Sequence, residues 1–297
     1  MAGAAFDLNA AQGMLLGLAV GDAVGTTVEF SARGSFEPVS DMIGGGPFQL
    51  EPGQWTDDTS MAICLANSLI HRQAWDPRDC MNRFVNWRDT GYASCTGSCF
   101  DIGLTTSSAL NRFLRDGDPY AGSKDPASSG NGGIMRLAPA VIALPDDQDA
   151  AVACAILQSR TTHASAECLE LAAGLAKILH SGELGAGGLD VQEISNRVED
   201  QIKSSGYVRH TLEAAVWSVA TTDTFGSAIL RAVNLGDDAD TVGAVTGQIA
   251  GRIYGINAIP TNWLSKLAWR DDLINLARRL YALPIDAPVD IPFTTPP

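Results

Sequence analysis

Two stretches of the sequence repeat glycine at every fourth position, and this spacing constrains the fold more strongly than any other feature. Residues four apart lie on the same face of a helix, and each glycine costs a helix about 1 kcal/mol relative to alanine. A stripe without side chains allows the backbone of another helix to come very close. We therefore expect two tightly packed central helices. The glycines are Gly13, Gly17, Gly21 and Gly25 in the first stretch and Gly243, Gly247, Gly251 and Gly255 in the second.

The rest of the chain shows apolar periodicity of helical length, and few segments show the alternation typical of strands. The sequence therefore predicts an all-α fold, with one domain over residues 1–283 and a Pro-rich, irregular tail over residues 284–297. The expected helices are Asn9–Val20, Thr59–His71, Asp79–Asp89, Leu104–Asp116, Gly133–Ala143, Asp149–Arg160, Ser165–Ser181, Val191–Ser204, Thr211–Thr221, Thr224–Val233, Thr241–Tyr254 and Pro260–Arg279.

The composition suits a globular protein with a well-filled core, because 45% of the 297 residues are hydrophobic and only 18% are charged. Phosphate-rich partners need basic protein surface, so the net charge of −14 argues against nucleic acid and anionic membranes. The N-terminal stretch lacks a basic leader, which indicates neither a signal peptide nor a membrane span. The six cysteines form no CxxC pair and no zinc spacing, and we expect them to be reduced in a cytoplasm.

Two segments far apart in the chain each place aspartates beside threonine at the start of an expected helix. They read "WTDDTSM" from residue 55 and "GDDADT" from residue 236. Either segment alone is explained by helix capping, because the side-chain oxygen of Asp or Thr accepts a free backbone N–H. A cap needs one oxygen, however, and these segments gather several carboxylates, whose mutual repulsion a divalent cation would remove.

The donor atoms of these segments also indicate which cations they suit. Carboxylate and hydroxyl oxygens favour magnesium or manganese over zinc, and the glycine and glutamate of an EF-hand are missing at the required offsets. The mirrored form of the segments therefore predicts two halves of one site for a pair of divalent cations. Such paired clusters would also permit a two-metal phosphohydrolase that cuts a nucleotide pyrophosphate, and this alternative stays open.

The segment "DGDPYAGSKDPASSGNGG", residues 116–133, is unusually long and rich in Gly, Ser, Pro and Asp. A loop of this length inside a compact helical domain is uncommon unless it binds something. Its "SSGNGG" end offers backbone N–H groups with little steric cover, which suits an anion or a phosphate. A surface connector has the same composition, and composition alone favours neither interpretation.

Six motifs, in order along nearly the whole chain, resemble those of the ADP-ribosylglycohydrolase family. They are "GLAVGDAVGTTVEF" (17–30), "GQWTDDTSMA" (53–62), "CFDIG" (99–103), "GNGGIMR" (130–136), "RTTH" (160–163) and "GDDADTVGAVTGQIAGRIYG" (236–255). The resemblance implies an all-helical, compact, single-domain orthogonal bundle with two divalent cations, Mn²⁺ or Mg²⁺, in a central cleft. It also implies hydrolysis of the bond between ADP-ribose and a modified protein side chain, with ADP-ribose as a product.

The resemblance also implies roles for individual residues of this chain. One cation would be held by Thr56, Asp57, Asp58 and Asp240, and the other by Asp238, Asp240 and Thr241. Proton transfer at the scissile bond would fall to Asp101 or Glu29, and the sequence does not choose between them. Contacts with the substrate would come from Asn131, Gly132, Arg136, His163 and Tyr207, the last by stacking on adenine.

The kind of side chain that carries the ADP-ribose is also implied by the resemblance. The "CFDIG" segment matches the nitrogenase-regulating members, which favours an ADP-ribosylated arginine protein as the partner, and we expect a monomer. The chain has Asp237 where many members have glycine, and Asp238 is taken as the cation ligand because it keeps the Asp-x-Asp-Thr register. A non-catalytic relative that binds ADP-ribose is a further alternative, against which the retained Asp and Thr ligands argue.

Overall fold

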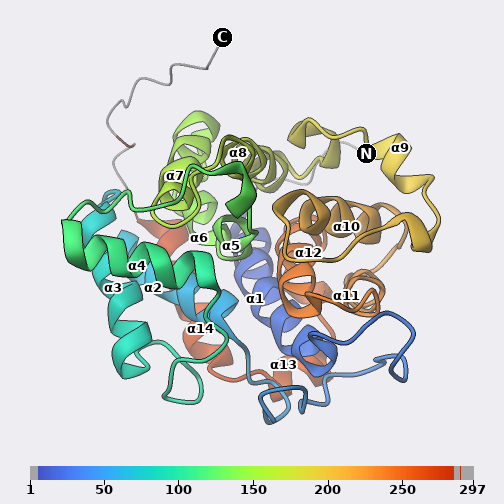
Figure 1. Cartoon of the computed structure of the whole chain (residues 1–297). Coiled ribbons are helices and arrows are strands. Elements are labelled where there is room, and N and C mark those ends of the chain that lie inside the picture. The colour runs from blue at the N-terminus through green and yellow to red at the C-terminus, as the bar shows by residue number, and fades with distance from the viewer. Residues whose placement is uncertain (1–5, 284–287, 289–297) are drawn as a thin grey trace.

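The computed structural model describes residues 6–283 and residue 288 (Figure 1). The described residues form helices joined by loops and contain no β-strand, so the all-α prediction is confirmed. The helices are α1 (Leu8–Gly25), α2 (Asp57–Arg72), α3 (Pro77–Thr90), α4 (Leu104–Asp116), α5 (Gly132–Met135), α6 (Ala138–Ile142), α7 (Gln148–Arg160), α8 (Ala166–Ser181), α9 (Val191–Ser195), α10 (Val208–Ala220), α11 (Phe225–Val233), α12 (Ala239–Tyr254), α13 (Thr261–Lys266) and α14 (Arg270–Ala282).

The two glycine stripes face each other in the centre of the molecule, on α1 and α12 (Figure 1). A Cβ atom on Gly17 would lie 2.2 Å from the carbonyl oxygen of Gly247, and one on Gly21 would lie 2.0 Å from that of Gly243. The paired residue numbers run in opposite directions, so the helices are antiparallel. The expected close helix pair is therefore present, and its contact is backbone against backbone.

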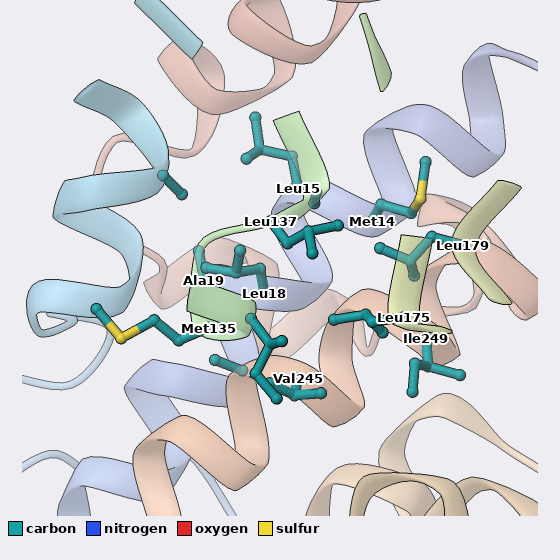
Figure 2. Close-up of a cluster of buried hydrophobic side chains, with 14 of the residues drawn as sticks. Met14, Leu15, Leu18, Ala19, Met135, Leu137, Leu175, Leu179, Val245 and Ile249 are labelled. Atoms are coloured by element: carbon teal, nitrogen blue, oxygen red, sulfur yellow. The ribbon is translucent and has the colours of Figure 1, made fainter. Parts of the chain in front are cut away.

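The α1 helix is surrounded by other elements, which explains why it is apolar on all sides. From Gly13 to Gly25 every one of its residues is buried, as expected of a helix without a solvent face. Figure 2 shows Met14, Leu15 and Leu18 of α1 in a cluster of buried side chains. The other labelled members of that cluster are Ala19, Met135, Leu137, Leu175, Leu179, Val245 and Ile249.

Three of the expected helices are shorter or divided. In each of them, proline or a tertiary contact competes with helical hydrogen bonding. The expected helix Gly133–Ala143 is two short helices, α5 and α6, since Pro139 lacks an N–H and restricts the residue before it. The expected helix Val191–Ser204 ends at Ser195. Beyond Ser195, the carbonyls of Glu199 and Ile202 accept hydrogen bonds from the Arg33 guanidinium rather than from a following turn of helix.

The expected helix Pro260–Arg279 is also divided, into α13 and α14. Between them Ala268 donates its N–H to the carbonyl of Gly53, and Trp269 takes a left-handed backbone conformation with φ of 53°. This long-range contact ties the C-terminal helices to the segment that leads into α2. The expected tail, residues 284–297, lies outside the described residues except for residue 288, so its boundary stays a prediction.

None of the described helices combines the length and the apolar character needed to cross a membrane.

The close contact of α1 and α12 can be tested by adding one methyl group. Gly17→Ala improves intrinsic helix propensity, which alone would stabilise the protein by about 1 kcal/mol. Its Cβ would lie 2.2 Å from a backbone oxygen, and we expect overpacking to lower the free energy of unfolding by about 2 kcal/mol. Chemical denaturation measures the change. The matched control is Gly185→Ala, which has open space around its Cβ; stabilisation by Gly17→Ala would refute the packing role.

Candidate active site

The register of α1 on α12 brings the acidic segments together. A Cβ on Gly25, at the end of α1, would lie 2.5 Å from the Cα of Asp240, so the first turn of α12 lies against the last turn of α1. The same place is reached by the start of α2, and a cleft of about 650 Å³ opens there. Its acidic lining consists of Glu29, Asp57, Asp101, Asp238 and Asp240.

Two groups of carboxylates share Asp240. In one group, oxygens of Asp57, Asp58 and Asp240 all lie within 4.8 Å of one another, and in the other the same holds for Glu29, Asp101 and Asp240. Asp240 therefore contributes an oxygen to both groups. The distant "TDDT" and "DADT" segments therefore meet in space, as their mirrored form predicts.

Several buried oxygens in this cluster lack a hydrogen-bond donor. The atoms are Asp58 Oδ1, Asp240 Oδ1 and Glu29 Oε2. An unpaired buried carboxylate oxygen is costly, and hard oxygen donors of this kind suit Mg²⁺ or Mn²⁺. The donor set therefore fits divalent cations.

The hydroxyl of Thr56 is likewise surrounded by more acceptor oxygens than it can donate to. Its Oγ1 lies 3.0 Å from Asp22 Oδ1, 3.4 Å from Asp58 Oδ2 and 3.2 Å from Asp240 Oδ2. A hydroxyl has one hydrogen to donate, so two of these three oxygen contacts need a proton or a cation to offset their repulsion. Thr241 adds a second hydroxyl, 3.4 Å from Asp58 Oδ2.

Burial and mutual repulsion hold these carboxyl groups partly protonated when no cation is bound. Burial, followed by the charge of Asp101, raises the pKa of Glu29 to about 10. Burial raises the pKa of Asp101 to about 7, although hydrogen bonds with Asp240 and Glu29 oppose the shift. The pKa values of Asp57, Asp58 and Asp240 are also well above the usual range, with burial as the largest cause.

Asp22 is a buried residue at the cluster to which the sequence motifs assign no role. Its carboxylate accepts hydrogen bonds from the backbone N–H and the hydroxyl of both Thr56 and Thr59, at distances of 2.6 to 3.1 Å. Asp22 thus caps α2 from α1 and fixes the turn that carries Asp57 and Asp58. The available signal was its position, directly after Gly21 in the first glycine stripe.

Asp238 and Glu29 have different surroundings in the cleft. Asp238 belongs to neither carboxylate group, and its Oδ2 accepts a hydrogen bond from the amide of Asn131, which also donates to Thr211 Oγ1 at 2.9 Å. Glu29 and Asp101, expected to transfer protons, lie beside Asp240. All of these except Thr211 line one cleft, and the division of ligands between two cations stays a prediction.

Arg136, which the resemblance places among the substrate contacts, lies in the core. Its side chain is completely buried and does not line the cleft. The guanidinium lies 4.7 Å from the ring centroid of Phe84 and donates a 3.2 Å hydrogen bond to Gln158 Oε1. The break between α5 and α6 turns this side chain into the core, where it supports the "RTTH" segment.

His163 does line the cleft, and a chain of hydrogen bonds starting at Arg136 orients its ring. Arg136 Nη2 donates to Thr162 Oγ1 at 2.6 Å, and Thr162 Oγ1 lies 2.8 Å from His163 Nδ1. Arginine can only donate, so the Thr162 oxygen accepts from Arg136. The buried Thr162 hydroxyl then donates its own hydrogen to Nδ1 of His163. The ring then carries its hydrogen on Nε2, which lies near Gly130 and Gly132.

The other expected substrate contacts lie around the "GNGG" loop. Asn131 and Gly132 line the cleft, so this end of the long loop does reach the site. Tyr207 does not line it. Its hydroxyl donates to Glu167 at 2.6 Å, and its ring packs edge-on against His210. Stacking of Tyr207 on adenine stays a prediction.

Apolar side chains at the cleft are a second feature to which the sequence motifs assign no role. Phe30 and Phe48 line it together with Leu104, and Phe30 and Leu104 are 66% and 87% exposed. The "VEF" motif contains Phe30, but an exposed position for an aromatic ring is not readable from a motif. The cleft thus combines carboxylates with an apolar edge.

The raised pKa values predict how pH affects the metal-free protein. Asp22 and Asp238 have pKa values of about 6 and Asp101 about 7, against a usual 3.8. An acid with a raised pKa holds its proton more tightly in the folded state than in the unfolded state. It therefore adds to the free energy of unfolding below about pH 4, and this stabilisation is lost as the pH rises through 6 to 7. We expect the Tm in EDTA to fall over this range and Mn²⁺ to restore it, more strongly at higher pH.

Scanning calorimetry at a series of pH values measures both effects. Asp22→Asn removes one titrating group without changing the acidic residues that we assign to the cations, so its Tm in EDTA should fall less steeply with pH. A Tm that rises between pH 4 and 7 without metal would contradict the account.

The tautomer of His163 can be observed directly, since the chain has four histidines. We expect ¹⁵N NMR to report hydrogen on Nε2 throughout pH 5–8, because burial lowers the pKa of His163 to about 3. Thr162→Val removes the donor to Nδ1 and should produce a mixture of tautomers, whereas Thr162→Ser keeps the wild-type spectrum. Hydrogen on Nδ1 in the wild-type protein would exclude the proposed chain of donors.

Comparisons with known proteins agree with this geometry. A model of the ADP-ribosylglycohydrolase family matches residues 4–288. The chain is 43% identical over 291 residues to ADP-ribosylarginine hydrolase Tri1 of Pseudomonas putida (strain GB-1), with 92% of this chain and 78% of that protein covered. It is 35% identical over 278 residues to the ADP-ribosyl-dinitrogen reductase glycohydrolase of Rhodospirillum rubrum, with coverages of 86% and 90%.

Among solved structures, one titled "ADP-ribosylglycohydrolase-related protein complex" is similar over 93% of this chain and 98% of its own, with a TM-score of 0.81 and 40% identity. The family and the enzyme class predicted from the motifs are thereby confirmed. The chain belongs to the ADP-ribosylglycohydrolase family.

Proposed function

We propose that this protein is a metal-dependent hydrolase that removes ADP-ribose from modified proteins, and that the modified side chain is arginine. The observation that carries the proposal is the pair of carboxylate groups sharing Asp240 in one cleft. The relative from Pseudomonas putida, named an ADP-ribosylarginine hydrolase, supports arginine as the linkage.

The substrate is an anion, and the protein is acidic, so binding has to be local. Among the described residues that line the cleft, none is lysine or arginine. The nucleotide must therefore be held by neutral donors, for which His163 Nε2 and the Gly-rich segment around Asn131 are suited. Of two divalent cations, Mn²⁺ or Mg²⁺, one would be held by Asp57, Asp58 and Asp240 together with Thr56. The other would be held by Asp238, Asp240 and Thr241. Such cations would orient the ribose hydroxyls and lower the pKa of water.

Cleavage of the N-glycosidic bond breaks the link between the ribose C1′ and the guanidinium nitrogen. Positive charge develops on the ribose, and the leaving nitrogen needs a proton. Asp101 is half-buried at the cleft, whereas Glu29 is 4% exposed. The more accessible Asp101 is therefore our candidate for proton transfer, which typically contributes about 10²–10⁴-fold to the rate, and Glu29 lies beside it in the same carboxylate group.

The alternative of a two-metal phosphohydrolase uses the same carboxylates and differs in its product. Incubation with Mn²⁺ or Mg²⁺ and an ADP-ribosylated arginine protein should release intact ADP-ribose, identified by chromatography. Release of AMP would support the phosphohydrolase. Binding of ADP-ribose with no product at any divalent-metal concentration would support a non-catalytic relative.

Substitution of the shared aspartate tests the bridging position. We expect Asp240→Asn to weaken uptake of both cations in calorimetry and to lower kcat/KM by more than about 100-fold, since even loss of an outer partner of a metal ligand costs about 10–100-fold. Asp57→Asn should affect mainly one cation. The matched control is Asp237→Asn, an exposed neighbour in neither carboxylate group; equal and slight effects of Asp240→Asn and Asp237→Asn would rule out the bridging role.

A further inference from the structure

The edge of the cleft carries an aromatic ring that the proposed hydrolysis does not yet use. Phe30 is 66% exposed, and its ring centroid lies 6.4 Å from that of Phe48, which lies 5.1 Å from that of Phe100. A large apolar side chain exposed beside buried carboxylates is not explained by the core. Exposed apolar surface next to a binding site commonly contacts a ligand.

The backbone holds this ring in place at an energetic cost. Phe30 has a φ of 61°, a left-handed conformation that is unfavourable for a bulky residue. Its N–H donates to the carbonyl of Asp237 at 2.7 Å, and the N–H of Asp237 donates to the carbonyl of Ser31 at 2.9 Å. These two hydrogen bonds join the turn after Glu29 to the turn before Asp238. A strained backbone persists where surrounding contacts hold it in place, and such strain is commonest at functional sites.

The surroundings of the ring select the chemistry of its ligand. Glu29 directly precedes Phe30 in the chain, and Asp101 lines the same cleft. The oxygens of these carboxyl groups accept hydrogen bonds, whereas a phosphate needs donors, so this edge does not suit the nucleotide half of the substrate. A guanidinium suits it well, because this planar cation stacks on an aromatic face and donates hydrogen bonds to carboxylates through its edge.

We propose that Phe30, backed by Phe48, forms the subsite for the guanidinium of the ADP-ribosylated arginine. The inference rests on the proposed function and adds a physical basis for the preferred linkage. Stacking orients the guanidinium with its edge toward Asp101. A neutral linkage, such as an ADP-ribosylated serine, gains nothing from the ring, so the subsite favours arginine.

The test compares two linkages in the full-length protein with Mn²⁺. The variants are Phe30→Ala, Phe30→Tyr, which keeps an aromatic face, and Leu114→Ala as the matched control. Leu114 is 55% exposed on α4 and does not line the cleft. The substrates are a peptide ADP-ribosylated on arginine and one ADP-ribosylated on serine, and calorimetry measures the affinity for free ADP-ribose.

For Phe30→Ala we expect the KM for the arginine peptide to rise about 5–30-fold, the range of a partly desolvated cation–π contact. Its affinity for ADP-ribose should stay within about 2-fold, and any activity on the serine peptide should be unchanged. Phe30→Tyr and Leu114→Ala should behave like the wild-type protein. A Tm near that of the wild type excludes loss of fold.

Three outcomes would overturn the subsite. They are an unchanged KM for the arginine peptide, a matching loss of affinity for free ADP-ribose, and an equal loss on both linkages. Failure of the proposed function looks different, because the wild-type protein would then release no ADP-ribose from the arginine peptide. In that case calorimetry tests the subsite by binding alone. The wild-type protein should bind the arginine peptide more tightly than ADP-ribose, and Phe30→Ala should bind both with equal affinity.

Discussion

The contact between the glycine stripes of α1 and α12 is the constraint on which the rest of the structure depends. With no side chains in between, each backbone fits against the carbonyls of the other, and a helix cannot slide by a residue without pushing a side chain into that backbone. The register is therefore fixed. It sets Gly25 against Asp240 and so brings Glu29, after the end of α1, to the start of α12.

The positions of the acidic turns explain how the fold tolerates so many buried acids in one place. The acidic turns lie at the N-terminal ends of α2 and α12, where the helix dipole and free backbone N–H groups favour negative charge. Both carboxylate oxygens of Asp22 accept hydrogen bonds at the start of α2. Asp58 and Asp240, in contrast, each have one oxygen without a donor. This difference separates an acid that builds the site from acids available to a cation.

The cleft has two unlike sides. We propose that one side binds the nucleotide and the other binds the arginine guanidinium. Around the "GNGG" loop, His163 offers a neutral donor whose orientation depends on the buried Arg136. Around Phe30, carboxylates and an aromatic ring suit a planar cation. In this proposal, the positive charge of Arg136 stays in the core and the neutral His163 ring lines the cleft, so an acidic protein would accept an anion without an exposed cation.

Local pattern in the sequence was enough to predict the helical class, the close helix pair and the carboxylate segments, because residue spacing and glycine content are local properties. The family resemblance pointed to Asn131, Gly132 and His163, which line the cleft. Tertiary structure alone decided which oxygens gather around Asp240, that Arg136 points into the core, that Asp22 caps α2, and that Phe30 is exposed. These depend on the register of distant helices and on competition for hydrogen bonds, and neither is encoded in the spacing of neighbouring residues.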